Sequence, residues 1–301
     1  TDDPLRVIVT LRTPNAPPLR APGAAQDAAN RVAHRAALVQ ARQATFEQAI
    51  APLTPLLEAA SAQGDLIAQR DLWIIHGVAL TARPALIQQL ATSPAVEALS
   101  LDHYHTYIEP PPFAEGEETF QLDEAPTWGL EKIRVPEVHN SLGITGTGAV
   151  IAIMDTGAEF RHPAIQANYR GNMGHKLFLH AASWFDPIND GAYPYDDHGH
   201  GTHVAGTAAG QTPIGVAPGA QWIAVKILNG NGAGYNSWIH AGFQWLLAPD
   251  GDPANAPDVV NCSWSSRMSN NYAVMEDINV VQAADIFPIF AAGNNGPRAY
   301  S

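Results

Sequence analysis

The chain has 301 residues, of which 46% are hydrophobic, so it is long enough for two domains and apolar enough for a sizeable core. Its formal net charge of −13 at pH 7 argues against nucleic acid or an anionic membrane as a partner. The sequence has no run of about 18 apolar residues that would span a membrane. Its single cysteine, Cys262, excludes an intrachain disulfide and a metal site made of thiolates alone.

Residues 1–103 are predicted to form a small α+β domain. Regularly spaced apolar residues predict strands at 5–11, 72–75 and 96–101 and helices at 24–51 and 84–91. Strand and helix alternate in this order, which favours a small antiparallel sheet covered by helices.

Residues 104–128 are rich in proline and acidic side chains and lack periodicity, so we expect an exposed linker. From residue 129 to 301, buried apolar runs alternate with helical patterns. The predicted strands lie at 150–154, 222–227, 259–264 and 286–291, and the predicted helices at 202–210, 237–247 and 272–284. Alternating strands and helices predict a parallel sheet with right-handed crossovers.

Two motifs in this second part carry catalytic chemistry. Asp155 ends the first apolar run, at the carboxyl edge where open parallel sheets place their functional groups. His200 lies in a turn flanked by Gly199 and Gly201, at the start of a helix. A serine hydroxyl needs a histidine to take its proton, and the histidine needs a buried carboxylate to hold its tautomer. We therefore predict Asp155 as the acid and His200 as the base, about 2.6 to 3.2 Å apart.

The histidines at 198, 200 and 203 also leave a zinc site open as an alternative. Glycines place the first two in a turn, whereas helical zinc ligands are usually four residues apart, so this alternative is less favoured. We expect His203 to pack on the helix behind His200, and we expect His198 to be an exposed loop residue.

The segment Asp196-Asp197-His198-Gly199-His200-Gly201-Thr202-His203-Val204-Ala205-Gly206, preceded by Asp155-Thr156-Gly157, resembles the subtilisin-like serine proteases, or subtilases. The resemblance implies an endopeptidase with a subtilisin-like parallel sheet and helices on both faces, whose C-terminal part is missing here. No serine in a Gly-Thr-Ser-Met-Ala-like segment occurs in the sequence. We therefore expect the catalytic serine on a further segment or a second chain, and no protease activity from these residues alone.

Further segments extend the resemblance. Ala291-Ala292-Gly293-Asn294 resembles the family's oxyanion segment, which implies that the Asn294 amide stabilises the tetrahedral intermediate. The family's substrate-binding strands correspond to Gly232, Ala233, Gly234, Ser263, Trp264 and Ser265. The first three would pair with an extended peptide as an added strand. Ser265 stands where the family usually has glycine, so its side chain would narrow the substrate pocket.

Residues 1–103 resemble the inhibitory propeptide of subtilases, a ferredoxin-like α+β domain. The resemblance implies that its tail lies in the cleft beside Gly232, and that maturation cuts the chain between about Tyr104 and Thr127. The sequence starts at Thr1 with no initiator methionine, which favours a leader already removed and a secreted protein.

The resemblance implies that catalysis requires no cofactor or metal. Ala164 follows His162-Pro163 where the family often has an aspartate ligand, so the common calcium site is expected to be lost. A structural calcium in the acidic stretch 186–197 stays open. The expected partners are a peptide or protein substrate, the chain's own N-terminal domain and the segment that carries the serine. The alternative to a protease is an inactive interaction or scaffold protein built on the same fold.

Overall fold

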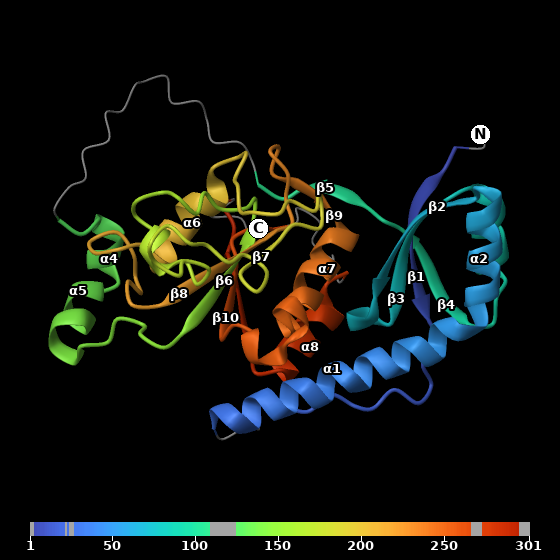
Figure 1. Cartoon of the computed structure of the whole chain (residues 1–301), viewed down its shortest axis with the longest axis horizontal. Coiled ribbons are helices and arrows are strands. Elements are labelled where there is room, and N and C mark those ends of the chain that lie inside the picture. Colours follow the sequence, from blue (N-terminus) through green and yellow to red (C-terminus); the bar gives the residue numbers. More distant parts are fainter. Residues whose placement is uncertain (1–2, 22, 24–26, 109–124, 266–272, 295–301) are drawn as a thin grey trace. The chain divides into compact units, whose positions relative to one another are not determined.

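The computed structural model describes residues 3–21, 23, 27–108, 125–265 and 273–294, and its residues fall into two compact units (Figure 1). Unit 1 comprises Thr1–His105, Tyr235–Ala256 and Asn270–Asp285, and unit 2 comprises Thr106–Gly234, Pro257–Ser269 and Ile286–Ser301. These two units are groups of residues that pack together in the folded chain. The predicted division into residues 1–103, 104–128 and 129–301 concerns maturation and stays a prediction.

The N-terminal part of unit 1 is an antiparallel four-stranded sheet with the strand order β2-β3-β1-β4. Its strands are β1 Leu5–Leu11, β2 Leu66–Leu72, β3 Gly77–Ala82 and β4 Val96–Leu101. Its helical segments are α1 Ala28–Ile50, η1 Ala51–Leu53, α2 Thr54–Gln63, η2 Trp73–Ile75 and α3 Pro84–Ala91. Val7, Val9 and Leu11 of β1 are buried in its core together with Phe46 of α1. The element order and the sheet order are those of a ferredoxin-like fold.

One predicted strand was wrong. Residues 72–75 were expected to form a strand, but Leu72 ends β2 and residues 73–75 form a 3₁₀ turn that closes at His76 with φ 48°. The pattern misled because β2 is largely exposed and polar, so its side chains do not alternate between apolar and polar. The sheet therefore has β2 and β3 in place of one predicted strand.

Two helices from the later part of the chain complete unit 1. They are α7 Asn236–Leu247 and α8 Met275–Ala283. Two short helical turns, η5 Pro249–Gly251 and η6 Pro253–Asn255, follow α7 in the chain. The helices pack against each other, and His240 of α7 is hydrogen-bonded to Asp277 of α8 at 2.8 Å with both side chains buried.

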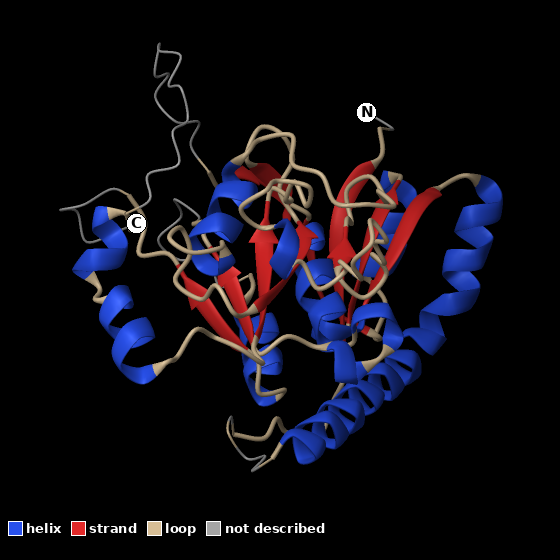
Figure 2. Ribbon diagram, turned by 60° about the vertical axis from the view of Figure 1, so that its left-hand side comes forward, coloured by secondary structure: helices blue, strands red, loops and turns tan. Residues whose placement is uncertain are grey.

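Unit 2 is built on a parallel five-stranded sheet with the order β11-β10-β6-β8-β7. Figure 2 draws the strands of the chain in red and its helices in blue. The strands are β6 Val150–Asp155, β7 Trp184–Phe185, β8 Gln221–Lys226, β10 Val259–Cys262 and β11 Phe287–Phe290. Helical segments are α4 Trp128–Lys132, α5 Val135–Glu137, η3 Val138–Leu142, η4 Gln166–Asn168 and α6 His200–Ala209. The predicted α/β fold is confirmed. Each of the four predicted strands appears within two residues of its expected start and end.

Two short strands, β5 Tyr104–Thr106 and β9 Ala233–Tyr235, form a separate two-stranded sheet. Neither was predicted, because three residues are too few for periodicity to show. The cysteine of β10, Cys262, is fully buried, and burial raises the pKa of its thiol, as expected of a small packed side chain. No described helix combines the length and the hydropathy needed to cross a membrane.

Candidate active site

Asp155 and His200 meet at the carboxyl edge of the parallel sheet. Asp155 is the last residue of β6, and His200 is the first residue of α6, which packs against β6. Nδ1 of His200 lies 2.8 Å from Oδ1 of Asp155, within the distance predicted from the sequence. The Asp155 side chain is fully buried, whereas the imidazole is 30% exposed. Nδ1 of the imidazole is therefore hydrogen-bonded to the buried carboxylate, while part of the ring is accessible to solvent.

The hydrogen bond that His200 donates to Asp155 raises the pKa of the imidazole. Burial opposes this shift, and the charges of Asp155 and Asp196 add to it. A neutral imidazole with its proton on Nδ1, donated to Asp155, leaves Nε2 as a proton acceptor. The pair can therefore take a proton from a hydroxyl group and stabilise the resulting imidazolium.

A second carboxylate, Asp196, holds the turn that carries His200. Its Oδ1 accepts hydrogen bonds from Thr156 Oγ1 at 2.9 Å and from the Gly199 amide at 2.8 Å, and its Oδ2 accepts from the Thr202 amide at 2.8 Å. Burial acts to raise the pKa of Asp196, but the hydrogen bonds from Thr202, Gly199 and Thr156 keep it below its ordinary value. Asp196 thus ties the residue after Asp155 to both sides of His200. The sequence motifs did not indicate this role.

Two glycines allow the end of β6 and the start of α6 to touch. Gly157 has φ 112°, and a Cβ there would lie 2.0 Å from the Tyr195 carbonyl oxygen. A Cβ on Gly201 would lie 2.0 Å from the carbonyl oxygen of Gly157. A side chain at either position would collide with the backbone of Tyr195 or Gly157 and displace the segments that carry Asp155 and His200.

A fully buried lysine supports the same region from β8. The Lys226 ammonium donates to the Thr156 carbonyl at 2.5 Å, to the Leu228 carbonyl at 3.1 Å and to the Asp197 carboxylate. Thr156 directly follows Asp155, Asp197 precedes His200 in the same turn, and Leu228 lies between β8 and Gly232 in sequence. A buried ammonium needs such partners, and here they come from three different loops.

The other two histidines lie differently from expectation. His203 is exposed on α6 rather than packed behind His200. His198 is partly buried, with its ring 6.1 Å from the His200 ring in an edge-to-face arrangement. The turn at Gly199, with φ 92°, sets these directions, and helical spacing cannot predict them. Within the described part of the chain, no group of three or more His, Cys, Asp and Glu side chains is arranged to hold a metal ion.

Three of the six predicted substrate-binding residues, Gly232, Trp264 and Ser265, contact the chain's own residues 107 and 108. The Gly232 carbonyl accepts hydrogen bonds from the amides of Tyr107 at 2.9 Å and Ile108 at 3.1 Å. From the other side, the Ser265 amide donates to the Tyr107 carbonyl at 3.4 Å. The Trp264 ring packs edge-to-face on the Tyr107 ring at 5.6 Å. Residues 107 and 108 therefore lie between the two segments that the sequence assigned to substrate.

The remaining predicted residues flank this arrangement. Ala233 and Gly234 are buried in β9, and the Ser263 hydroxyl accepts a hydrogen bond from Nδ2 of the Asn261 side chain at 2.8 Å. Asn294 follows β11 and is exposed. Because parallel strands end at one edge of a sheet, Asn294 leaves β11 at the same edge as Asp155 leaves β6.

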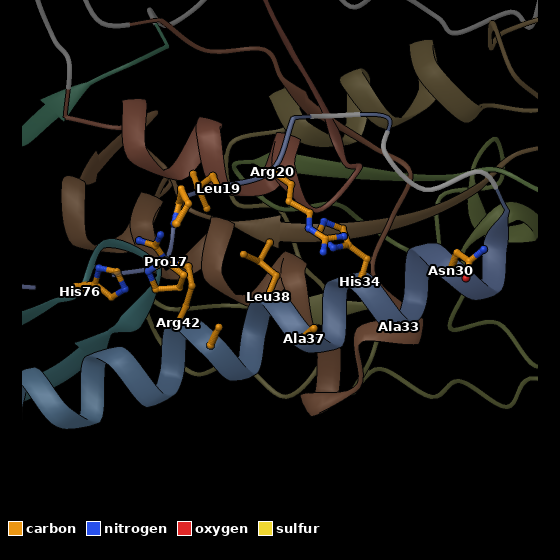
Figure 3. A pocket seen from close by; sticks show the side chains of 12 residues that line it. Pro17, Leu19, Arg20, Asn30, Ala33, His34, Ala37, Leu38, Arg42 and His76 are labelled. Carbon is orange, nitrogen blue, oxygen red and sulfur yellow. The ribbon is translucent and has the colours of Figure 1, made fainter. Parts of the chain in front are cut away.

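A cavity of about 580 Å³ lies in unit 1, between residues 17–20 and α1 (Figure 3). None of the predicted site residues lines it. His76 and Arg42 line it from buried positions, and Nε2 of His76 has no hydrogen-bond partner among the described residues. Burial and the Arg42 charge lower the pKa of His76 to about 4. This imidazole is therefore neutral at pH 7.

Comparison with known proteins agrees with this geometry. The profile of the subtilase family matches residues 146–301. Bacillopeptidase F of Bacillus subtilis (strain 168) is 33% identical over 275 residues, which are 86% of this chain and 19% of that protein. Subtilisin E of the same organism is 29% identical over 233 residues, 76% of this chain and 52% of the relative. The M-protease of Shouchella clausii (strain KSM-K16) is 33% identical over 210 residues, 68% of this chain and 48% of the relative. The chain thus spans about half of these two proteases and about a fifth of bacillopeptidase F.

Proposed function

Since the chain belongs to the subtilase family, we propose that it is part of a serine endopeptidase proenzyme that hydrolyses peptide bonds. Asp155 orients His200, and the nucleophilic serine lies outside these 301 residues. The observation that carries the proposal is the 2.8 Å hydrogen bond between a fully buried carboxylate and a partly exposed imidazole.

The proposed reaction uses His200 twice. Nε2 takes the proton of the serine hydroxyl while the serine oxygen bonds to the scissile carbonyl carbon. The side-chain amide of Asn294 donates a hydrogen bond to the resulting oxyanion. The imidazolium then protonates the departing amine as the peptide C–N bond breaks. Water, deprotonated by His200, releases the acyl group from the serine by the same steps. Asp155 stays ionised throughout and stabilises the imidazolium.

We propose that substrate binds as an extended strand between Gly232–Gly234 and Ser263–Ser265. The support is that Tyr107 and Ile108 make main-chain hydrogen bonds to Gly232 and Ser265 on both sides. Before maturation these residues would block the site. A cut between about Tyr104 and Thr127 would free it, and N-terminal sequencing of protein matured from the complete gene locates the cut. A mature protein starting well before Leu99 would contradict this part.

The N-terminal residues 1–103 would act as an inhibitory and folding domain. Support comes from their packing on α7, a helix of the matched region. The Asp102 carboxylate accepts from the amide of Ser237 at 2.9 Å and from its hydroxyl at 2.7 Å, so it caps the first turn of the helix. Arg6 holds the same carboxylate at 3.0 Å.

Two observations support the proposal that the catalytic serine lies outside these 301 residues. The sequence contains no serine in the family's glycine-flanked setting. The strand β11, at the edge of the sheet, exposes Phe287 and Ile289 by 53% and 55%, and such apolar surface favours a covering segment. The 301 residues alone would then lack the covalent route and retain at most roughly 10³ to 10⁴-fold acceleration over water.

Three further points complete the proposal. Catalysis would require no cofactor, and the common calcium site of the family would be absent because Ala164 replaces its acidic ligand. The mature protein would be secreted, which fractionation of the producing cells tests. The alternative from another class is an inactive interaction or scaffold protein.

Peptide hydrolysis separates the protease from the alternatives. The protein expressed from the complete gene should cleave a fluorogenic peptide, and His200→Ala should lower kcat by roughly 10⁶-fold. His203→Ala, which changes an exposed histidine of the same helix, should leave kcat within about twofold. An inactive wild-type protein would favour the scaffold. Activity lost to a chelator together with stoichiometric metal would favour a zinc hydrolase.

A further inference from the structure

Helix α1 makes two different sets of contacts along its length. Its buried side chains form one stripe at helical spacing: Arg35, Val39, Arg42 and Phe46. Phe46 belongs to the core of the N-terminal sheet, with Ala49 and Ile50 packed against that core. The two arginines belong to no such core, yet each is at most 5% exposed. Guanidinium groups are buried at this level only where acceptors surround them.

Two acceptors of Arg35 directly follow α8, and a third, the Ala256 carbonyl, lies 3.5 Å from Nη1; all three lie in unit 1. Arg35 Nε donates to the Ala284 carbonyl at 2.7 Å, and Nη2 donates to the Asp285 carbonyl at 3.2 Å. The neighbouring His34 lies with Nε2 2.6 Å from the Ala283 carbonyl. The last carbonyl groups of a helix have no hydrogen-bond donor within the helix and lie at the negative end of its dipole. A cationic donor at this end therefore supplies the missing hydrogen bonds and interacts favourably with the dipole.

The other end of α8 is held by Arg42. Its guanidinium lies 2.8 Å from the Glu276 carboxylate in the first turn of α8. From Arg35 to Arg42 the helix rises about 10 Å, and from Glu276 to Ala284 about 12 Å. The two helices therefore run antiparallel with matched spacing between the contacts at their ends. Figure 3 shows His34, Leu38 and Arg42 projecting from α1.

We propose that residues 34–42 of α1 are a docking surface for α8, and that Arg35 anchors the N-terminal domain to the rest of the protein after the linker is cut. This inference rests on the proposed function in taking residues 1–103 as a separable domain. The contact is distinct from the capping of α7 by Asp102. It binds the end of α8, which leads directly into β11 and Asn294 along the chain.

The test uses the whole 301-residue chain with a recognition site for an added endopeptidase inserted in the linker. After cutting, the dissociation constant of the two fragments is measured by labelling one of them with a fluorophore. Arg35→Met should raise this constant at least tenfold. Gln43→Met, an exposed position on the same helix, should leave it within twofold.

Folding of the uncut variants is checked by circular dichroism. If Arg35→Met fails to fold uncut, Arg35→Lys replaces it, because one ammonium can reach fewer of these carbonyls and should still weaken binding severalfold. Unchanged affinity in the folded arginine variant, or wild-type fragments that separate at once, would overturn the inference. The measurement needs no peptidase activity. Absence of protease function in the complete protein would therefore refute the proposed function and leave this result standing.

Discussion

At the scale of single residues, the Asp155 carboxylate decides both the tautomer and the basicity of His200. In Asp155→Asn the amide can no longer accept and stabilise the Nδ1 proton in the same way, so we expect kcat of the complete enzyme to fall by about 10⁴-fold with little change in KM. Asp190→Asn, an exposed aspartate, is the matched control.

The same variant should change the pH profile. His200 acts as a base only when neutral, so kcat/KM falls as the pH drops through its pKa, which Asp155 raises above the ordinary 6.5. The acidic limb of wild type should therefore lie above pH 6.5, and that of Asp155→Asn should lie lower. Superimposable limbs would show that Asp155 does not set the basicity of His200.

Sequence motifs located Asp155 and His200 but missed Asp196 and Lys226 beside them, and also missed the buried arginines Arg35 and Arg42 of unit 1. Asp196, Lys226, Arg35 and Arg42 are charged residues whose partners are backbone groups or side chains distant in sequence. Hydrophobic periodicity treats such residues as exposed, so it cannot find a buried charge whose acceptors come from other loops.

At the scale of elements, the buried His240–Asp277 pair links α7 to α8. Burial alone would lower the pKa of His240, but the charge and the hydrogen bond of Asp277 outweigh it, and the pKa is raised. A raised folded-state pKa means that the pair stabilises the fold fully below pH 6.5 and that this contribution is lost as the pH rises through the folded-state value.

Asp277→Asn should therefore lower the free energy of unfolding by about 3 kcal/mol at pH 6 and by less at pH 9. Urea unfolding of the 301-residue chain at both pH values measures this, with the exposed Asp250→Asn as the control. A loss of the same size at both pH values would show that the interaction does not depend on a protonated His240.

The Gly232 turn is a second element with a testable geometry. Gly232 has φ 66°, and a Cβ there would lie 2.7 Å from the Ile108 carbonyl oxygen. Gly232→Ala should therefore crowd any extended chain bound there and raise KM for a peptide substrate about tenfold, with a smaller effect on kcat. Gly174→Ala is matched in backbone, since Gly174 has φ 77° and open space around it. Equal kinetics for the two variants would contradict strand-like binding at Gly232.

The elements themselves differed in how well the sequence revealed them. The strand at 5–11 and the helix at 84–91 have clear periodicity and formed with the predicted bounds. The short β7 and β9 and the exposed β2 lack such patterns. Their pairing partners specify them instead: β7 and β9 pair with strands far away in sequence, whereas β2 pairs with β3 across the turn at 73–75.

At the scale of the whole molecule, the α/β class followed from alternating strands and helices, and the family followed from two short motifs. The ferredoxin-like order of the N-terminal part came from the resemblance, since periodicity alone located only two of its four strands, β1 and β4. The packing of α7 and α8 with residues 1–105 in one compact unit was not foreseen. It depends on side chains such as Asp102 and Arg35, whose roles appear only once the chain is folded.

The central claim is that Asp155 and His200 activate a serine beyond Asn294. Labelling the protein from the complete gene with a fluorophosphonate, followed by mass spectrometry of its peptides, tests this most directly. We predict one labelled serine on the C-terminal side of residue 301, with labelling abolished by His200→Ala and unaffected by His203→Ala. A label on a serine within residues 1–301, or no label on the active wild-type protein, would contradict the account.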